Sequence, residues 1–126
     1  MLDESRSAHS GKSVRQLREP EIALLRALVL KARDQDKFLN QLASLGVQEM
    51  SDGGMGGLYL LSPAKTQDQR RFGRRIADLQ FNDADGVAIL ASLNVDQDGD
   101  LYELDVWKTD FTPVRQLAPP KLPGTG

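Results

Sequence analysis

The periodicity of apolar residues changes once along this chain, and that change constrains the fold more than any other feature. Before Gly46, apolar side chains recur every three or four residues in "EIALLRALVLKAR" and again over residues 38–45. This spacing predicts an N-terminal helix or a kinked pair of helices. From Val47 onward the period is two, which is typical of strands with one buried face. The sequence therefore predicts an α+β fold whose helical part comes first.

Five segments carry the period of two: "VQEM", "GLYLLS", "RRIADLQFN", "GVAILASLNV" and "LYELDVWKT". The short Asp-Gly turns "DADG" and "DQDG" separate the last three, and turns of this kind join neighbouring antiparallel strands. We expect these three strands to form a meander. The helical part should pack on a strongly bent, five-stranded antiparallel sheet of the small-barrel type.

Length and flanking composition indicate one domain. A chain of 126 residues is of ordinary length for a single hydrophobic core. We expect a disordered leader at residues 1–17, one α+β domain at 18–117 and a flexible Pro/Gly tail at 118–126. No stretch approaches the roughly 20 apolar residues of a membrane span, and no apolar signal-peptide segment opens the chain. The sequence predicts a cytoplasmic protein without membrane contact.

Composition excludes several chemistries. The chain has no cysteine and a single histidine, His9, which lies in the polar leader. Disulfides, thiolate nucleophiles, thiolate metal sites and Ser-His pairs are therefore not expected. We expect no cofactor and no enzymatic activity.

Charge is distributed unevenly along the chain. Residues 1–77 carry 13 basic and 9 acidic side chains, whereas residues 78–126 carry 3 basic and 9 acidic ones, which gives +4 against −6. Such polarity can steer a charged partner or allow copies to associate head to tail. Two solvated faces of opposite sign are the simpler interpretation.

A glycine-rich segment joins the first two strand candidates. No helix follows it, so no helix N-terminus is positioned to bind a phosphate, and a turn with positive φ is favoured. Met55 lies either at the tip of this turn or packed beneath it. The residues of this candidate binding loop are Asp52, Gly53, Gly54, Met55 and Gly56.

The only dense basic cluster lies where the third strand begins. Guanidinium groups bind phosphates and carboxylates through paired hydrogen bonds, so this cluster could contact RNA or an acidic partner. A solvated run at the entrance of a strand is the alternative. The cluster consists of Arg70, Arg71, Arg74 and Arg75.

The segment "NVDQDGDLYELD" matches the first half of a calcium-binding loop. It places Asn94, Asp96 and Asp98 at alternate ligand positions and Asp105 at the closing position. The calcium loop, however, lies between helices and closes with a glutamate, whereas both flanks here are strand candidates. We therefore expect a hairpin turn and no metal site, with these four residues as the metal-ligand candidates.

Glu103, Asp105 and Trp107 alternate along the last strand and should project from one face as a surface patch. Paired carboxylates can serve in hydrolysis, but acid–base catalysis needs a pocket that separates their pKa values. The sequence supplies no such pocket, so a half-exposed strand face is expected.

Three segments resemble a family of small uncharacterised bacterial proteins: "DGGMG" at 52–56, "LNVDQDG" at 93–99 and "LYELDVWKTDF" at 101–111. The resemblance covers nearly everything after the leader. The order of a helix followed by five strands is also similar to a variant Sm-like fold, which implies a strongly bent antiparallel sheet. True Sm proteins bind RNA through two signature segments that this chain lacks, so the resemblance assigns RNA binding to no residue.

The sequence therefore predicts a non-catalytic binding or interaction module, with another protein as the expected partner. Three alternatives stay open: an RNA-binding module that uses the cluster at 70–75, an immunity-type protein that masks a basic partner, and a carboxylate-dependent metal protein or hydrolase. A homo-oligomer is compatible with each of them.

Overall fold

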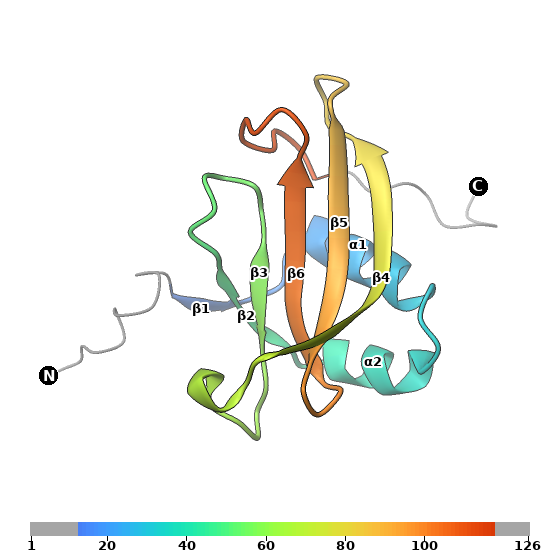
Figure 1. Cartoon of the computed structure of the whole chain (residues 1–126), viewed down its shortest axis with the longest axis vertical. Coiled ribbons are helices and arrows are strands. Elements are labelled where there is room, and N and C mark those ends of the chain that lie inside the picture. Colours follow the sequence, from blue (N-terminus) through green and yellow to red (C-terminus); the bar gives the residue numbers. More distant parts are fainter. Residues whose placement is uncertain (1–12, 118–126) are drawn as a thin grey trace, which may run out of the picture.

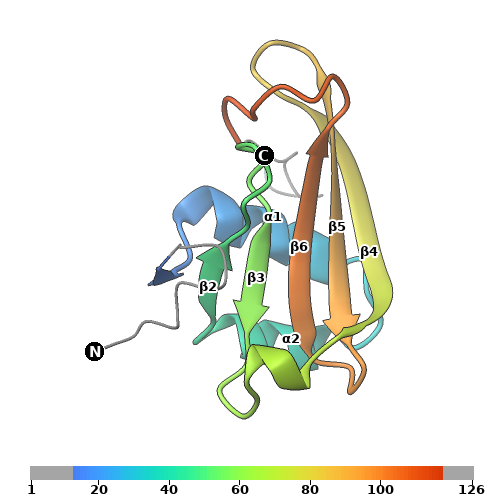
Figure 2. The same ribbon diagram turned by 60° about the vertical axis from the view of Figure 1, so that its left-hand side comes forward.

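The computed structural model describes residues 13–117, which form a six-stranded antiparallel sheet with two helices on one of its faces (Figures 1 and 2). The α+β prediction is confirmed. The helices are α1 (Glu19–Val29) and α2 (Gln35–Leu42). The strands are β1 (Val14–Gln16), β2 (Gly46–Glu49), β3 (Leu58–Leu61), β4 (Phe72–Asn82), β5 (Ala88–Asp96) and β6 (Leu101–Lys108), and the short 3-10 helix η2 (Gln67–Gln69) precedes β4.

The helical part is a pair of helices, as the sequence predicts. Pro20 lies in the first turn of α1, where its missing N–H would have no partner inside the helix. The Glu21 carboxylate accepts a hydrogen bond from the backbone N–H of Arg18 (2.8 Å) and so stabilises the start of the helix. Within residues 13–117, no helix is long and apolar enough to cross a membrane.

The order of strands in the sheet is β1-β2-β3-β6-β5-β4. The meander predicted for the last three strands is confirmed, since β4 pairs with β5 and β5 pairs with β6. Their turns contain Gly86 and Gly99, whose φ values of 84° and 87° are readily adopted only by glycine. Beyond the meander β6 pairs with β3, so the last strand lies at the centre of the sheet.

The strand count of five predicted from the sequence is wrong. The sixth strand, β1, takes Val14–Gln16 from the segment that we expected to be a disordered leader, and Val14 lies opposite Gln48 of β2. These three residues carry no local strand signal, and they are ordered by pairing with residues 30 to 34 positions further along the chain. Residues 1–12 of the expected leader and the whole of the expected tail (118–126) lie outside the described residues.

The sheet does not close into the small barrel that we expected. β1 and β4 lie at its two edges and do not pair with each other. The sheet is nevertheless irregular along β4, where the register with β5 shifts between Phe72 and Arg74 and again between Arg75 and Ala77. Bulges of this kind bend a strand and increase its twist. The Sm-like resemblance is not confirmed.

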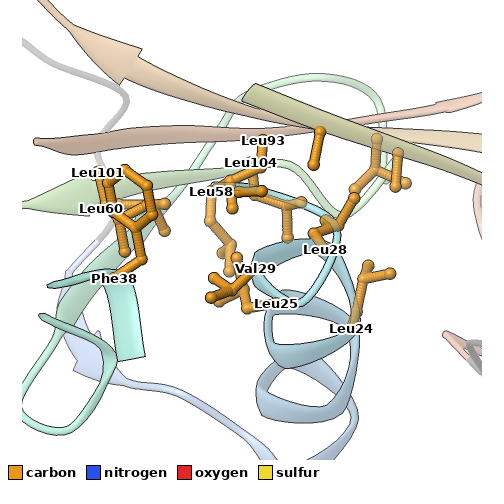
Figure 3. Packing of buried hydrophobic residues seen from close by; sticks show 14 of the residues in the cluster. Leu24, Leu25, Leu28, Val29, Phe38, Leu58, Leu60, Leu93, Leu101 and Leu104 are labelled. Carbon is orange, nitrogen blue, oxygen red and sulfur yellow. The ribbon is translucent and has the colours of Figure 1, made fainter. Parts of the chain in front are cut away.

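One apolar core lies between the helices and the sheet (Figure 3). Leu25, Leu28 and Val29 of α1 face the strands, and Phe38 of α2 lies beside Leu60 and Leu101. Burial of this apolar surface is the main favourable term in folding. The inward residues of β5 are Ile89, Ala91, Leu93 and Val95, all of which belong to this core.

The opposite face of the sheet is covered by neither helix, and we call it the uncovered face. Because side chains alternate along a strand, the residues between the core positions of β5 and β6 project there. Across the two strands Leu90 lies opposite Trp107, Ser92 opposite Asp105 and Asn94 opposite Glu103.

Candidate functional site

The glycine-rich loop between β2 and β3 is a tight turn held by one aspartate. The Asp52 carboxylate accepts hydrogen bonds from two backbone N–H groups of the loop, at 3.1 and 2.9 Å. Gly53, Gly54 and Gly56 have φ values of 73°, 84° and 97°, which side-chain-bearing residues rarely adopt. The glycines therefore serve the turn that the sequence favours.

Met55 points into the molecule. It is 9% exposed, and its Sδ accepts a hydrogen bond from the backbone N–H of Lys108 (3.4 Å). On the outer side the Val114 N–H donates to the Gly54 carbonyl (3.0 Å), and Pro113 lies where a Cβ on Gly54 would point. The loop is thus packed between β6 and the segment that follows it, and Met55 is not an exposed contact at the loop tip.

A hollow of about 500 Å³ lies between this loop, β1 and the start of α1. Four of its charged side chains pair with one another, since Arg15 donates to Glu21 (2.7 Å) and to Glu49 (3.0 Å) and Arg18 lies 3.6 Å from Glu49, while Asp52 binds backbone N–H groups of the loop. Because the charges of opposite sign neutralise one another, this hollow offers a charged ligand little.

The fold separates the four arginines that the sequence groups together. Arg70 is buried, with Nε 2.9 Å from Asp96 Oδ2, and its two other nitrogens donate to the backbone carbonyls of Leu60 and Leu101. Its guanidinium thus joins β3 and β6 beyond the point where their pairing ends. The prediction that Arg70 contacts a phosphate or an acidic partner is wrong, because the side chain is used inside the protein.

Arg71, Arg74 and Arg75 are exposed. Arg74 lies opposite Val95 of the core, whereas Arg75 lies opposite Asn94, so the two arginines project to opposite faces of β4. Arg75 also lies 3.8 Å from Asp78 on its own strand. The three exposed arginines therefore do not form one compact anion-binding surface.

Three carboxylates of the β5–β6 turn surround a lysine. Lys65 Nζ lies 2.6 Å from Asp96, 3.1 Å from Asp98 and 2.9 Å from Asp100. Burial raises the pKa of Asp96, but the hydrogen bonds from Lys65 and Arg70 outweigh it and hold that pKa well below the usual range. A cation of the chain itself thus occupies the centre of the turn.

The four metal-ligand candidates are split between two places. Asp96 and Asp98 share Lys65, whereas Asn94 and Asp105 lie together on the uncovered face. Among residues 13–117, no three His, Cys, Asp or Glu side chains form a group that could hold a metal ion.

Sequence reasoning missed a buried lysine at the end of β6. The side chains of Lys108 and Asp83 are both fully buried, 2.9 Å apart, and Asp85 also contacts Lys108 (2.5 Å). Asp83 further accepts backbone hydrogen bonds from Arg115 (2.7 Å) and Gln116 (2.9 Å). Burial raises the pKa of Asp83, but these donors together hold it far below its usual range. The cluster ties the segment after β6 to the β4–β5 turn.

The predicted patch of Glu103, Asp105 and Trp107 lies on the uncovered face, where one further residue joins it. The Asn94 Nδ2 group donates to Glu103 Oε1 (3.3 Å) and to Asp105 Oδ2 (3.1 Å). Asn94 is 3% exposed, and its Oδ1 has no hydrogen-bond partner among the described residues. We call Asn94, Glu103 and Asp105 the acceptor cluster. The strand register, which no local pattern encodes, brings Asn94 to the two carboxylates.

Glu103 differs electrostatically from the other acidic residues described above. Burial raises its pKa, the hydrogen bond from Asn94 lowers it, and the charge of Asp105 raises it further, with a net rise above the usual value. Within residues 13–117, no lysine or arginine forms an ion pair with Glu103 or Asp105. The acceptor cluster therefore carries negative charge without a counterion from the described part of the chain.

An exposed aromatic pair adjoins the acceptor cluster. The rings of Trp107 and Phe111 lie 5.6 Å apart, and these residues are 44% and 70% exposed. Phe111 has a φ of 64°, the only positive φ of a non-glycine residue among residues 13–117. Beside Trp107 a shallow hollow of about 540 Å³ extends over Leu90 to Asp105. Phe111 belongs to a segment that the sequence singles out, but only the turn after β6 places it next to Trp107.

A family model described as a domain of unknown function (DUF6984) matches residues 14–118. No curated protein and no solved structure matches the chain.

Proposed function

The chain belongs to the DUF6984 family, and we propose that it is a non-catalytic interaction module that binds a partner protein through the uncovered face. The observation that carries this proposal is the exposed pair Trp107 and Phe111 beside the carboxylates Glu103 and Asp105. These four residues follow one another along β6 and the turn after it, so a single partner segment can contact all of them.

The aromatic pair supports binding to a protein. Tryptophan is enriched among the residues that dominate the free energy of protein–protein binding, and such residues lie in desolvated centres of the interface. A bulky residue with positive φ carries backbone strain, and strain of this kind concentrates at functional positions. Phe111 combines that strain with 70% exposure, so packing inside the protein does not explain why phenylalanine occupies this position.

Charge complementarity specifies a basic partner. Among the described residues of β4, β5 and β6, the uncovered face carries the acidic residues Glu103, Asp105 and Asp78 against one cation, Arg75. Complementary potentials steer association and exclude partners of like charge. The immunity-type function, masking of a basic partner, agrees with this charge. RNA is disfavoured, because its phosphates would approach carboxylates and because Arg70 is buried.

Site-directed cross-linking tests the proposal. Two variants of the full chain would be expressed in the source organism. One carries the photoreactive residue p-benzoylphenylalanine at position 111 in place of Phe111, and the control carries it at position 30 in place of Leu30. Leu30 is also exposed (40%) but follows α1, away from the uncovered face. We expect a covalent adduct with one basic protein from position 111 and none from position 30.

Reconstitution completes this experiment. The purified partner should bind the wild-type chain and Leu30→Ala with equal affinity. It should bind Trp107→Ala at least about tenfold more weakly, a loss of about 1.4 kcal/mol of binding free energy, which is modest for an interface residue. An adduct with a second copy of the chain or with nucleic acid would overturn the assignment, as would equal binding by Trp107→Ala.

A further inference from the structure

We infer that the acceptor cluster, Asn94, Glu103 and Asp105, is a receptor for one cationic side-chain head of the partner, a guanidinium or an ammonium group, with Trp107 as its aromatic wall. This inference rests on the proposed function and specifies the chemistry of its central contact.

The cluster is organised before any ligand arrives. The carboxamide of Asn94 donates to both carboxylates, at 3.3 and 3.1 Å, and so holds Glu103 and Asp105 side by side. Asn94 itself is 3% exposed and fixed within β5, between the neighbouring strands β4 and β6. Carboxylates held in place lose little conformational entropy when a cation binds, and this lowers the cost of binding.

The two carboxylates of the cluster can accept more hydrogen bonds than the two that Asn94 donates to them. Asn94 Oδ1 also has no hydrogen-bond partner among the described residues, but this atom is itself buried, so an incoming cation would contact the carboxylates of Glu103 and Asp105. Arg75 lies opposite Asn94 on β4, but its ion pair is with Asp78 (3.8 Å). The unfilled capacity is thus for N–H groups that carry positive charge, which lysine and arginine supply.

The other two carboxylate clusters described above show the contrast. Asp96 and its neighbours in the β5–β6 turn surround Lys65, and Asp83 and Asp85 contact Lys108. In each, a lysine of this chain supplies the cation. The acceptor cluster has no such lysine within residues 13–117, and it lies at the surface where a partner can supply one.

The wall of the receptor is aromatic. Trp107 is the next residue after Asp105 on the same face of β6, about 7 Å along the strand. A guanidinium that contacts Asp105 can therefore lie against the indole ring, an arrangement that cation–π attraction favours. A metal ion fits less well, because among residues 13–117 no three His, Cys, Asp or Glu side chains form a group that could hold one.

Titration with small side-chain analogues tests the inference on the full chain. The probes are N-acetyl-arginine N-methylamide, its lysine equivalent and the uncharged citrulline equivalent. Trp107 is the only tryptophan of the chain, so its fluorescence and indole N–H resonance report on the site, as do the Asn94 side-chain amide resonances. We expect saturable shifts with the arginine probe, the lysine probe or both, and at least tenfold weaker binding of the citrulline probe.

Two variants of the cluster and one control variant test whether its charge is needed for binding. Glu103→Gln and Asp105→Asn keep the shape of the cluster but remove its charge, and each should weaken binding of the cationic probe at least tenfold. Asp78→Asn, which removes an exposed carboxylate elsewhere on the same face, should change it less than twofold. Equal binding of the citrulline probe, or unchanged binding by both cluster variants, would overturn the inference.

The partner obtained by cross-linking separates the two proposals. If Trp107→Ala abolishes partner binding but Glu103→Gln and Asp105→Asn leave it unchanged, the cation receptor is refuted and the interaction surface stands. If Trp107→Ala and both cluster variants leave it unchanged, the uncovered face is not the interface and both proposals fail.

Discussion

Arg70 and Asp96 form an ion pair in which both side chains are fully buried, with 2.9 Å between Nε and Oδ2. The pair joins the segment before β4 to the end of β5, 26 residues further along the chain. Because Arg70 also donates to carbonyl groups of β3 and β6, a single guanidinium connects three strands at the end of the sheet where β3 and β6 no longer pair.

Arg70→Ala should destabilise the protein by about 3–5 kcal/mol, because it leaves the buried carboxylate of Asp96 without the one of its two cationic partners that is itself buried. The matched control is its neighbour Arg71, whose side chain is exposed; Arg71→Ala should change stability by less than about 0.5 kcal/mol. Urea unfolding of both variants measures the difference. Similar losses in the two variants would contradict the structural role of Arg70.

Gly54→Ala should destabilise the protein by about 1–2 kcal/mol, since its φ of 84° is unfavourable for any residue with a Cβ. The added methyl would also approach Pro113 to 3.0 Å. Gly46→Ala is the control, because no positive φ applies there and its Cβ would meet Val14 at an ordinary 3.6 Å. Thermal melts should show a loss in the first variant only, and an unaltered melting temperature of Gly54→Ala would argue against the turn.

Lys65→Met should lower stability and create a calcium response that the wild type lacks. Without the ammonium group the carboxylates of Asp96, Asp98 and Asp100 repel one another, and a cation relieves that repulsion. Lys37→Met is the control, since Lys37 lies only at the rim, 3.8 Å from Asp100. Differential scanning calorimetry with and without calcium should show a rise in melting temperature for Lys65→Met alone. A calcium-dependent rise in the wild type would mean that the ion displaces Lys65.

The raised pKa of Glu103 predicts a pH dependence of stability. The groups around it are Asp105 on β6, Asn94 on β5, Arg75 beyond it on β4 and Tyr59 on β3. Because the folded-state pKa lies above the unfolded one, ionised Glu103 costs stability above that pKa, and the cost disappears as the pH falls through it.

Glu103→Gln should therefore be more stable than the wild type at neutral pH, by less than about 1 kcal/mol, and the difference should vanish near pH 4. Affinity of the wild type for a cationic probe should fall over the same interval, since protonation removes the charge that the cation meets. Urea unfolding and probe titration at several pH values measure both effects. A lower stability of Glu103→Gln at neutral pH would show that Glu103 has an internal counterion after all.

Local patterns predict local structure in this chain. The start of α1 at Glu19-Pro20, the turns at Gly86 and Gly99 and the loop at 52–57 each follow from a few adjacent residues. The hairpins β4–β5 and β5–β6 were predictable for the same reason, because an Asp-Gly turn and alternation on both sides of it lie within one short segment. β1 was not, because its three residues are ordered only by β2.

The candidate site divides in the same way. Glu103, Asp105 and Trp107 share one face because side chains alternate along any strand, so the sequence alone determined that they would lie together. Their partners come from elsewhere: the register of β5 against β6 brings in Asn94, and the turn after β6 brings in Phe111. Register depends on how whole strands bury their apolar faces, and no local pattern records it.

The sequence by itself determined the order of the two helices and of the strands β2 to β6, the turns and the absence of thiol chemistry, because backbone preferences and side-chain alternation act over a few residues. Only the tertiary structure decided which charges are neutralised inside the protein. Lys65 and Asp96 are 31 residues apart and Arg70 and Asp96 are 26 apart, so neither pair can be inferred from neighbours in the chain. Packing removes these charges from water and makes the pairing obligatory, whereas Glu103 and Asp105 form no ion pair within residues 13–117.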